Sequence, residues 1–197
     1  MIPELGHFAL ILALILSLVQ AVVPLVGARR NSMALMAVGR PAAQGQFFFI
    51  LFSYVCLTWA FITSDFSVQL AASNSHVETP IMYKITGVWG NHEGSLLLWA
   101  MSLSLWTVAV TVFSRHLPDA FLARVLGVLG MVSAGFISFT LVTSNPFERL
   151  LPGVAEGRDL NPLLQDPGMI IHPPLLYMGY VGFSVAFAFA IAALMSG

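Results

Sequence analysis

Residues 9–26 of the chain, ALILALILSLVQAVVPLV, form a continuous apolar run. An α-helix needs about 20 such residues to cross the hydrocarbon core of a bilayer. Strands can cross a bilayer only in a closed barrel, where apolar and polar residues alternate over segments of about 10 residues. The run shows no such alternation, so it predicts a transmembrane helix over about residues 7–26.

Four more apolar stretches of similar length follow, at about residues 41–63, 95–114, 120–143 and 173–195. The 197-residue sequence is 58% hydrophobic and only 9% charged, and its mean hydropathy is +0.87. About 25% of the residues of an average soluble domain are charged. We therefore predict an all-α integral membrane protein, a polytopic bundle of about five transmembrane helices that forms one domain over residues 1–197.

The start of the chain, MIPELGHF, argues against a cleaved signal peptide. Signal peptides begin with a basic segment and end at a cleavage site of small residues. This stretch contains an acid and no Lys or Arg. The first apolar run is therefore expected to be a retained helix.

The basic residues predict the orientation in the membrane, because short loops rich in Lys and Arg stay in the cytoplasm. Five of the eight flank the two short turns, after the first and third predicted helices: Arg29, Arg30, Arg40, Arg115 and Arg124. The other three lie in the two longer loops, 64–94 and 144–172: Lys84, Arg149 and Arg158. We therefore expect the N-terminus and both long loops to lie outside.

Both long loops have the composition of ordered segments. Residues 66–70, FSVQL, alternate like a strand, and residues 144–172 are rich in the Pro, Asn and Asp that build fixed turns. Apolar residues are spread through the second loop. We expect the two loops to form an ordered cap over the outer ends of the helices.

Two classes of function are disfavoured by the composition. Cys56 is the only cysteine, so the chain has neither an internal disulfide nor a CxxC redox pair, and we expect this thiol to be a packing residue. Charged residues are nearly absent from the five predicted spans. Ion and proton pathways normally need such residues at membrane depth, which disfavours a pump or an ion channel.

Residues 171–183, IHPPLLYMGYVGF, contain the first candidate site residue. Proline suits the first turn of a helix, so Pro173 and Pro174 predict the start of the fifth helix and place His172 at its cap. The positive end of the helix dipole favours neutral imidazole, which is the form that binds a metal. Tyr177 follows as a candidate hydrogen-bonding partner. A plain helix-capping role for His172 remains open.

The stretch WGNHEGSLLLWA, residues 89–100, places a histidine and a glutamate at the start of the third span. Adjacent residues on a helix point about 100° apart, so His92 and Glu93 cannot hold one metal together. Trp89 and Trp99 also fit an interfacial aromatic belt, and Glu93 fits a first-turn acid that complements the helix dipole.

Arg158, in the stretch EGRDLNP, is a candidate partner for a propionate or another carboxylate, because its guanidinium binds carboxylates in bidentate fashion. Pairing with the neighbouring Glu156 or Asp159 is the alternative. His7, His76 and His116 carry no motif and receive no role.

Four segments together carry a family resemblance: WGNHEGSLLLWA at 89–100, TSNPFERLLP at 143–152, EGRDLNPLLQDPG at 156–168 and IHPPLLYMGYVGFSVAFAFAIAAL at 171–194. They resemble the N-terminal part of the CcmF-type cytochrome c biogenesis proteins, the haem lyase subunits of the bacterial system I pathway. The related subunit of nitrite reductase maturation is the alternative within the family.

The resemblance implies a bacterial inner-membrane protein with periplasmic loops. It implies that haem b arrives from a periplasmic haem chaperone and is attached to apocytochrome c by thioether bonds. The proteins that deliver or reduce the apocytochrome are expected as further partners, and no nucleic acid is expected. His172 matches a histidine that ligates the haem iron. The remaining residues expected in the wall of the site are Trp89, His92, Glu93, Trp99, Arg158 and Tyr177, and none is assigned as catalytic.

The sequence also departs from the family pattern. The tryptophan-rich WWD motif and the family's other haem-ligating histidines are not found within these 197 residues. We therefore expect the chain to be the N-terminal part of a longer protein and to be incomplete as a lyase without the C-terminal part. Two alternatives remain, namely a non-catalytic scaffold that docks the chaperone and the apocytochrome, and a haem transporter.

Overall fold

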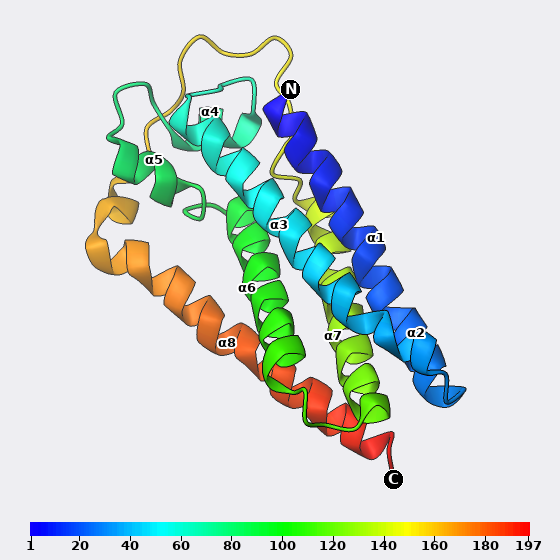
Figure 1. The fold of residues 1–197 in the computed structure, drawn as a ribbon. Helices are drawn as coiled ribbons and strands as arrows, with labels where there is room; N and C mark the ends of the chain where they lie inside the picture. The colour runs from blue at the N-terminus through cyan, green and yellow to red at the C-terminus, as the bar shows by residue number, and fades with distance from the viewer.

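The computed structural model describes residues 1–197, and the predicted apolar runs form five long helices in it (Figure 1). They are α1 (Ile2–Arg29), α3 (Gly39–Ile62), α6 (His92–Phe113), α7 (Asp119–Thr143) and α8 (Pro167–Leu194). All five are long and apolar enough to cross a membrane, α3 together with the short α2 (Met33–Ala37) that precedes it. The prediction of an all-α membrane protein with about five spans is confirmed.

The largest difference from the predicted ranges is at the start of α8. This helix begins at Pro167, six residues before the predicted start at 173. Asp166 is its N-cap, and its carboxylate accepts hydrogen bonds from the backbone N–H groups of Gly168 (2.8 Å) and Met169 (3.2 Å). Asp at the cap followed by Pro at the first helical position is a stronger start signal than a proline pair alone.

The prediction that His172 caps the helix is therefore wrong. His172, Pro173 and Pro174 all lie inside α8, in its second turn. His172 also lies beyond the reach of the helix dipole, because the field of the dipole falls off within the first turn.

Small residues bring α1 and α7 into backbone contact. A side chain at Gly130 of α7 would place its Cβ 2.6 Å from the backbone nitrogen of Ala21 in α1. One turn earlier on α7, Gly127 lies against the side chain of Leu25. Such close approach is how transmembrane helices gain packing contacts without a hydrophobic driving force between them.

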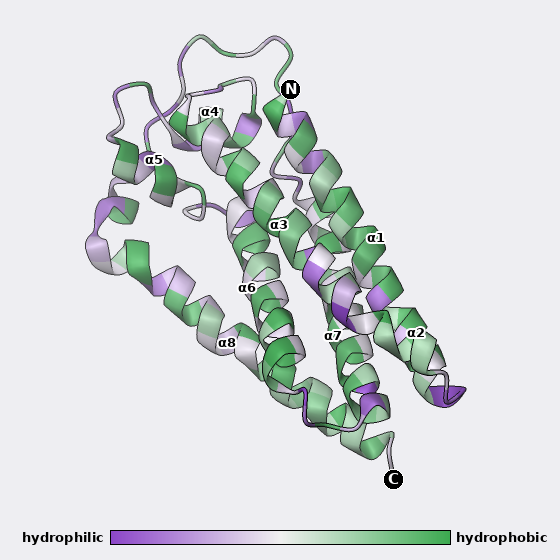
Figure 2. Cartoon of the chain, viewed as in Figure 1, coloured by the Kyte–Doolittle hydropathy of each residue, from purple (hydrophilic) through white to green (hydrophobic).

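Two apolar clusters fill the bundle. One lies mainly between α1, α3 and α6 and includes Cys56, which is buried as expected of a packing residue. The other lies between α6, α7 and α8. α8 is packed on one side only, since 17% of its most apolar segment is buried, against 39–50% for the other four spans. Figure 2 shows apolar residues over most of its length.

The two long loops contact each other at the outer end of the bundle and form what we call the outer cap, residues 63–91 and 144–166. They contain α4 (Gln69–Asn74), α5 (Ile81–Gly87) and a 3₁₀ turn, η1 (Pro162–Gln165). Backbone hydrogen bonds join the loops, among them Leu150 N to Ser67 O and Gln69 N to Glu148 O. The strand expected from FSVQL is reduced to a single bridge between Val68 and Arg149, because α4 begins at the next residue.

Two basic side chains hold the segments of the cap together and attach the cap to the helices. Lys84 is buried, and its ammonium donates to Ser64 Oγ (2.7 Å) and to the carbonyl of Val77 (3.0 Å). Arg149 lies 3.4 Å from Glu4 of α1 and 3.5 Å from Asp65 in the other loop of the cap. The cap therefore has a defined position above the bundle.

The close contact between α1 and α7 gives a test of the packing. Gly130→Val should lower the free energy of unfolding by about 1–3 kcal/mol, because the added side chain forces the two backbones apart. Gly135→Val on the same helix is the matched control, since a Cβ there meets nothing within 4 Å. Unfolding of the purified variants in detergent measures both, and equal stability of the two variants would contradict this packing.

Candidate functional site

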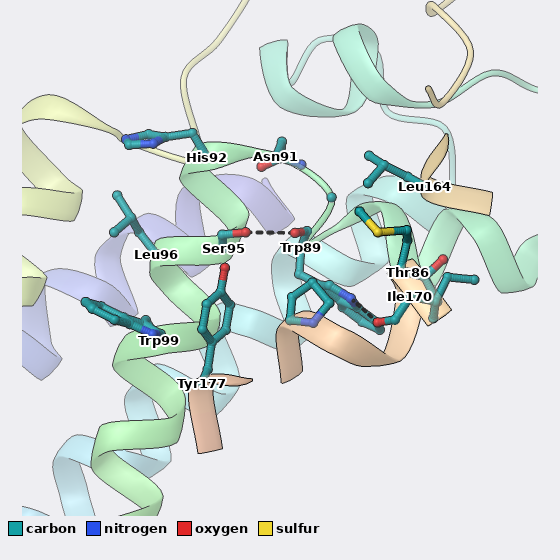
Figure 3. A pocket seen from close by; sticks show the side chains of 13 residues that line it. Thr86, Trp89, Asn91, His92, Ser95, Leu96, Trp99, Leu164, Ile170 and Tyr177 are labelled. Carbon is teal, nitrogen blue, oxygen red and sulfur yellow. Dashed lines mark hydrogen bonds between the residues drawn. The ribbon is translucent and has the colours of Figure 1, made fainter. Parts of the chain in front are cut away.

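A cavity of about 500 Å³ opens at the outer end of the bundle, between α6, α8 and the link from α5 to α6 (Figure 3). Four predicted site residues line it, from three different segments: Trp89, His92, Trp99 and Tyr177. Most of the remaining wall is apolar, with Leu96, Leu164, Met169, Ile170 and Pro173. The cavity is thus an aromatic and apolar hollow that opens at the outer surface.

One hydrogen bond connects the link before α6 to the first turns of α8. The indole Nε1–H of Trp89 donates to the backbone carbonyl of Ile170 at 3.1 Å. In a regular helix this carbonyl would accept from the residue four positions later, which is Pro174 and has no N–H. Trp89 therefore supplies the donor that the proline removes, and α8 continues through its proline pair.

The turn before α6 is tightly wound. The side-chain oxygen of Asn91 accepts from the N–H of Gly94 (2.7 Å), and its amide donates to the carbonyl of Gly87 (2.9 Å). A Cβ at Gly94 would overlap the carbonyl of Val88, so only glycine fits there. The spacing Asn91–Gly94 thereby fixes where Trp89 stands relative to α6.

His92 and Glu93 point to different surroundings, as predicted for neighbours on a helix. His92 Nε2 lies 2.9 Å from Ser144 Oγ at the end of α7. Figure 3 shows its ring turned away from Trp89. Glu93 lines a separate polar depression of about 250 Å³ together with Glu148 and other polar residues. The two side chains therefore line different cavities.

Trp99 forms the inner wall of the cavity within an aromatic cluster. Its ring meets Phe136 edge-on (centroids 4.6 Å apart) and Tyr177 edge-on (6.0 Å), and it stacks on Tyr180 (6.3 Å, planes 19° apart). Its buried Nε1–H has no hydrogen-bond partner. Such a cluster offers flat apolar faces, which suit contact with a planar aromatic ligand.

His172 is close to this cavity in sequence but lies on another face of α8. Met169, Ile170, Pro173 and Tyr177 share the face that lines the cavity. His172 is rotated by about 100° from Pro173, and its side chain is exposed. A ligand bound to this imidazole would therefore lie along the open flank of the helix.

Arg158 is part of the outer cap and lines none of the cavities described here. Its backbone N–H donates to the carbonyl of Ala72 (2.7 Å), and its side chain is exposed. The expected alternative, pairing with Glu156 or Asp159, is not formed. Glu156 lies 3.6 Å from His76 Nε2, and Asp159 accepts from Thr79 Oγ1 at 3.2 Å. The guanidinium is thus free to bind another carboxylate.

A family model described as cytochrome C assembly protein matches residues 89–196. The chain belongs to this family. The match begins at Trp89 and includes α6, α7 and α8, so it contains nearly the whole wall of the cavity.

Relatives of the family cover the whole chain. A cytochrome c-type biogenesis protein CcmF of Pseudomonas aeruginosa is 64% identical over 198 residues, and the one of Escherichia coli is 54% identical. A biogenesis protein named NrfE, from Haemophilus influenzae, is 43% identical, so the chain is more similar to these CcmF proteins. The chain spans about 30% of the length of these relatives.

A solved structure named cytochrome c heme lyase CcmF has the same fold. It matches the whole chain with a TM-score of 0.85 and 27% sequence identity, and the chain covers 31% of it. The helical arrangement described above is therefore that of a CcmF-type protein.

Several residues of the cavity wall were not predicted from the sequence, among them Ile170 and Ser95. The carbonyl of Ile170 accepts from Trp89, and the hydroxyl of Ser95 donates to the backbone carbonyl of Trp89 at 2.8 Å (Figure 3). The signal for Ile170 was present, because a proline inside a helix always leaves the carbonyl four positions earlier without its donor.

The bond between Trp89 and Ile170 can be tested by a double-mutant cycle. Trp89→Phe removes the indole N–H, so amide exchange over residues 170–176 should become about fivefold faster, since one net hydrogen bond contributes about 1 kcal/mol. Pro174→Ala returns a backbone N–H to the Ile170 carbonyl. The effect of Trp89→Phe should then be much smaller in the Pro174→Ala background.

Amide exchange is measured by mass spectrometry in the wild type, the two single variants and the double variant. The four rates give the coupling free energy between Trp89 and Pro174. Trp59→Phe is the control, because the Trp59 side chain is half exposed and makes no hydrogen bond. An equal effect of Trp89→Phe with and without Pro174 would show that this bond does not hold α8.

Proposed function

We propose that the chain is the part of a cytochrome c haem lyase that holds haem at the outer face of the membrane. In this proposal the substrate is haem b, delivered by a periplasmic haem chaperone, and the full-length protein attaches it to apocytochrome c by thioether bonds. The observation that carries the proposal is an exposed histidine on α8 beside an aromatic cavity, in a chain whose relatives mature c-type cytochromes.

His172 is proposed as an axial ligand of the haem iron. The flank of α8 on which it lies is open and apolar, with Leu175, Leu176 and Phe183 exposed. One turn beyond Leu175 a side chain at Gly179 would meet nothing within 4 Å, so this flank has room for a flat macrocycle. The part of the family protein outside this chain would close the other side of the haem.

Such a ligand would contribute to the reaction through position. An imidazole bond from His172 to the iron would hold the haem at α8, and contacts with the porphyrin edge would then be needed to bring its vinyl groups to the cysteine thiols of the apocytochrome. Holding reactants in place in this way contributes a large part of many rate enhancements. Axial ligation by imidazole also tunes the redox potential of the iron.

The other site residues are proposed to support this position. Trp89 holds the start of α8, while Trp99 and Tyr177 form the aromatic wall behind it. Arg158, whose guanidinium is free, is proposed to bind a haem propionate or another carboxylate. His92 and Glu93 are proposed as edge residues, since one contacts Ser144 and the other faces the polar depression.

Replacement of His172 separates a haem ligand from a docking scaffold. In cells whose full-length protein carries His172→Ala, we expect haem-stained c-type cytochromes to be lost at normal membrane abundance of the variant. His116→Ala is the matched control, because His116 is also exposed but lies at the opposite end of the bundle. Full maturation with His172→Ala would favour a scaffold that uses only the outer cap.

The proposal also requires a bacterial inner-membrane location with the outer cap in the periplasm. A cysteine placed at Glu156 in a Cys56→Ala background should react with a membrane-impermeant maleimide in cells with a permeabilised outer membrane. A cysteine at His116 should react only after the inner membrane is broken. The reverse pattern would place the cap in the cytoplasm and remove the access of a periplasmic chaperone.

A further inference from the structure

The end of the bundle opposite the outer cap is strongly basic. It carries five arginines and a single acid, Asp119. None of these arginines lies within 4 Å of a carboxylate, since the ion pairs of the chain involve only the N-terminus, His76 and Arg149. Asp119 lines a separate small depression that it shares with Arg40. Most of the positive charge at this end is therefore free to meet an anion.

Two of these arginines border an apolar groove. The groove has a volume of about 380 Å³ and is lined by Leu25, Val26 and Arg29 of α1, Arg124 of α7 and Met195 after α8. Leu25 and Val26 lie one turn before Arg29, so the groove has an apolar part at membrane depth and a cationic part at the helix end. This order, from apolar to cationic, is that of a phospholipid from its acyl chains to its phosphate.

Arg124 is held in place on this groove. Its Nη1 donates to Ser196 Oγ at 2.6 Å, and this hydroxyl donates in turn to the carbonyl of Ala192 at 2.7 Å. A guanidinium has five N–H donors, and only one of them is used here. The side chain is half-buried, and the remaining donors lack a partner within the chain.

We propose that this groove binds one anionic phospholipid. The phosphate lies between the guanidinium groups of Arg29 and Arg124, and an acyl chain runs along Leu25, Val26 and Met195. Guanidinium groups bind phosphate oxygens in bidentate fashion, and basic pockets between transmembrane helices bind lipid headgroups at the membrane surface. The site is independent of haem, because it lies at the other end of the bundle from the cavity and from His172.

The test uses the full-length protein in nanodiscs of phosphatidylcholine with phosphatidylglycerol that carries a diazirine in its acyl chain. Illumination of the wild type should label peptides that contain Leu25–Arg29 and Arg124. The double variant Arg29→Gln/Arg124→Gln should lose about tenfold or more of this labelling, since it removes both guanidinium groups that bind the phosphate through charge-assisted hydrogen bonds.

The matched control is Arg30→Gln/Arg115→Gln, which removes the same charge from the same end of the bundle but outside the groove. It should keep the labelling of the wild type. Equal loss in both double variants would mean that the lipid responds only to surface charge, and this would overturn the site. If the wild type is labelled at other helices instead, that result alone would overturn the proposed site.

Discussion

The outer part of α8 depends on the hydrogen bond from Trp89 to the carbonyl of Ile170. α8 carries His172 and one side of the cavity, yet most of its surface is not covered by the chain. Its proline pair would normally end or kink the helix, because it removes backbone donors. The indole N–H of Trp89 replaces the donor lost at Pro174. The stretch around Trp89 and the stretch around His172 are thus joined by a hydrogen bond.

The sequence alone predicts the long helices but not how α8 begins. The five spans follow from apolar length, which the bilayer requires of any single helix. The start of α8 was predicted wrongly, because the proline pair was taken as a first turn while Asp166 and Pro167 cap the helix one and a half turns earlier. Trp89, His92, Trp99 and Tyr177 come together at one cavity, since they lie near the outer ends of two helices, and their role there stays a prediction. The rotation of His172 away from the cavity depends on that helix start, so it could not be predicted.

The two ends of the bundle differ in charge and in packing. Eight of the nine acidic residues lie at the outer end, and the cap there is fixed by the buried Lys84 and by Arg149. The opposite end has unpaired arginines and an apolar groove. Between them, α8 leaves one apolar flank open, in a chain that spans about 30% of its relatives. In the proposed function, this open flank is where the haem lies.

The claim that His172 binds haem iron is tested most directly by a change of ligand. In the full-length protein loaded by the haem chaperone, His172→Cys should replace an imidazole nitrogen by a thiolate sulfur. The account predicts that the electron paramagnetic resonance spectrum of the ferric protein gains the signal of thiolate-bound haem, while any haem bound elsewhere keeps its own signal. A spectrum identical to that of the wild type, at equal haem content, would contradict the assignment of His172.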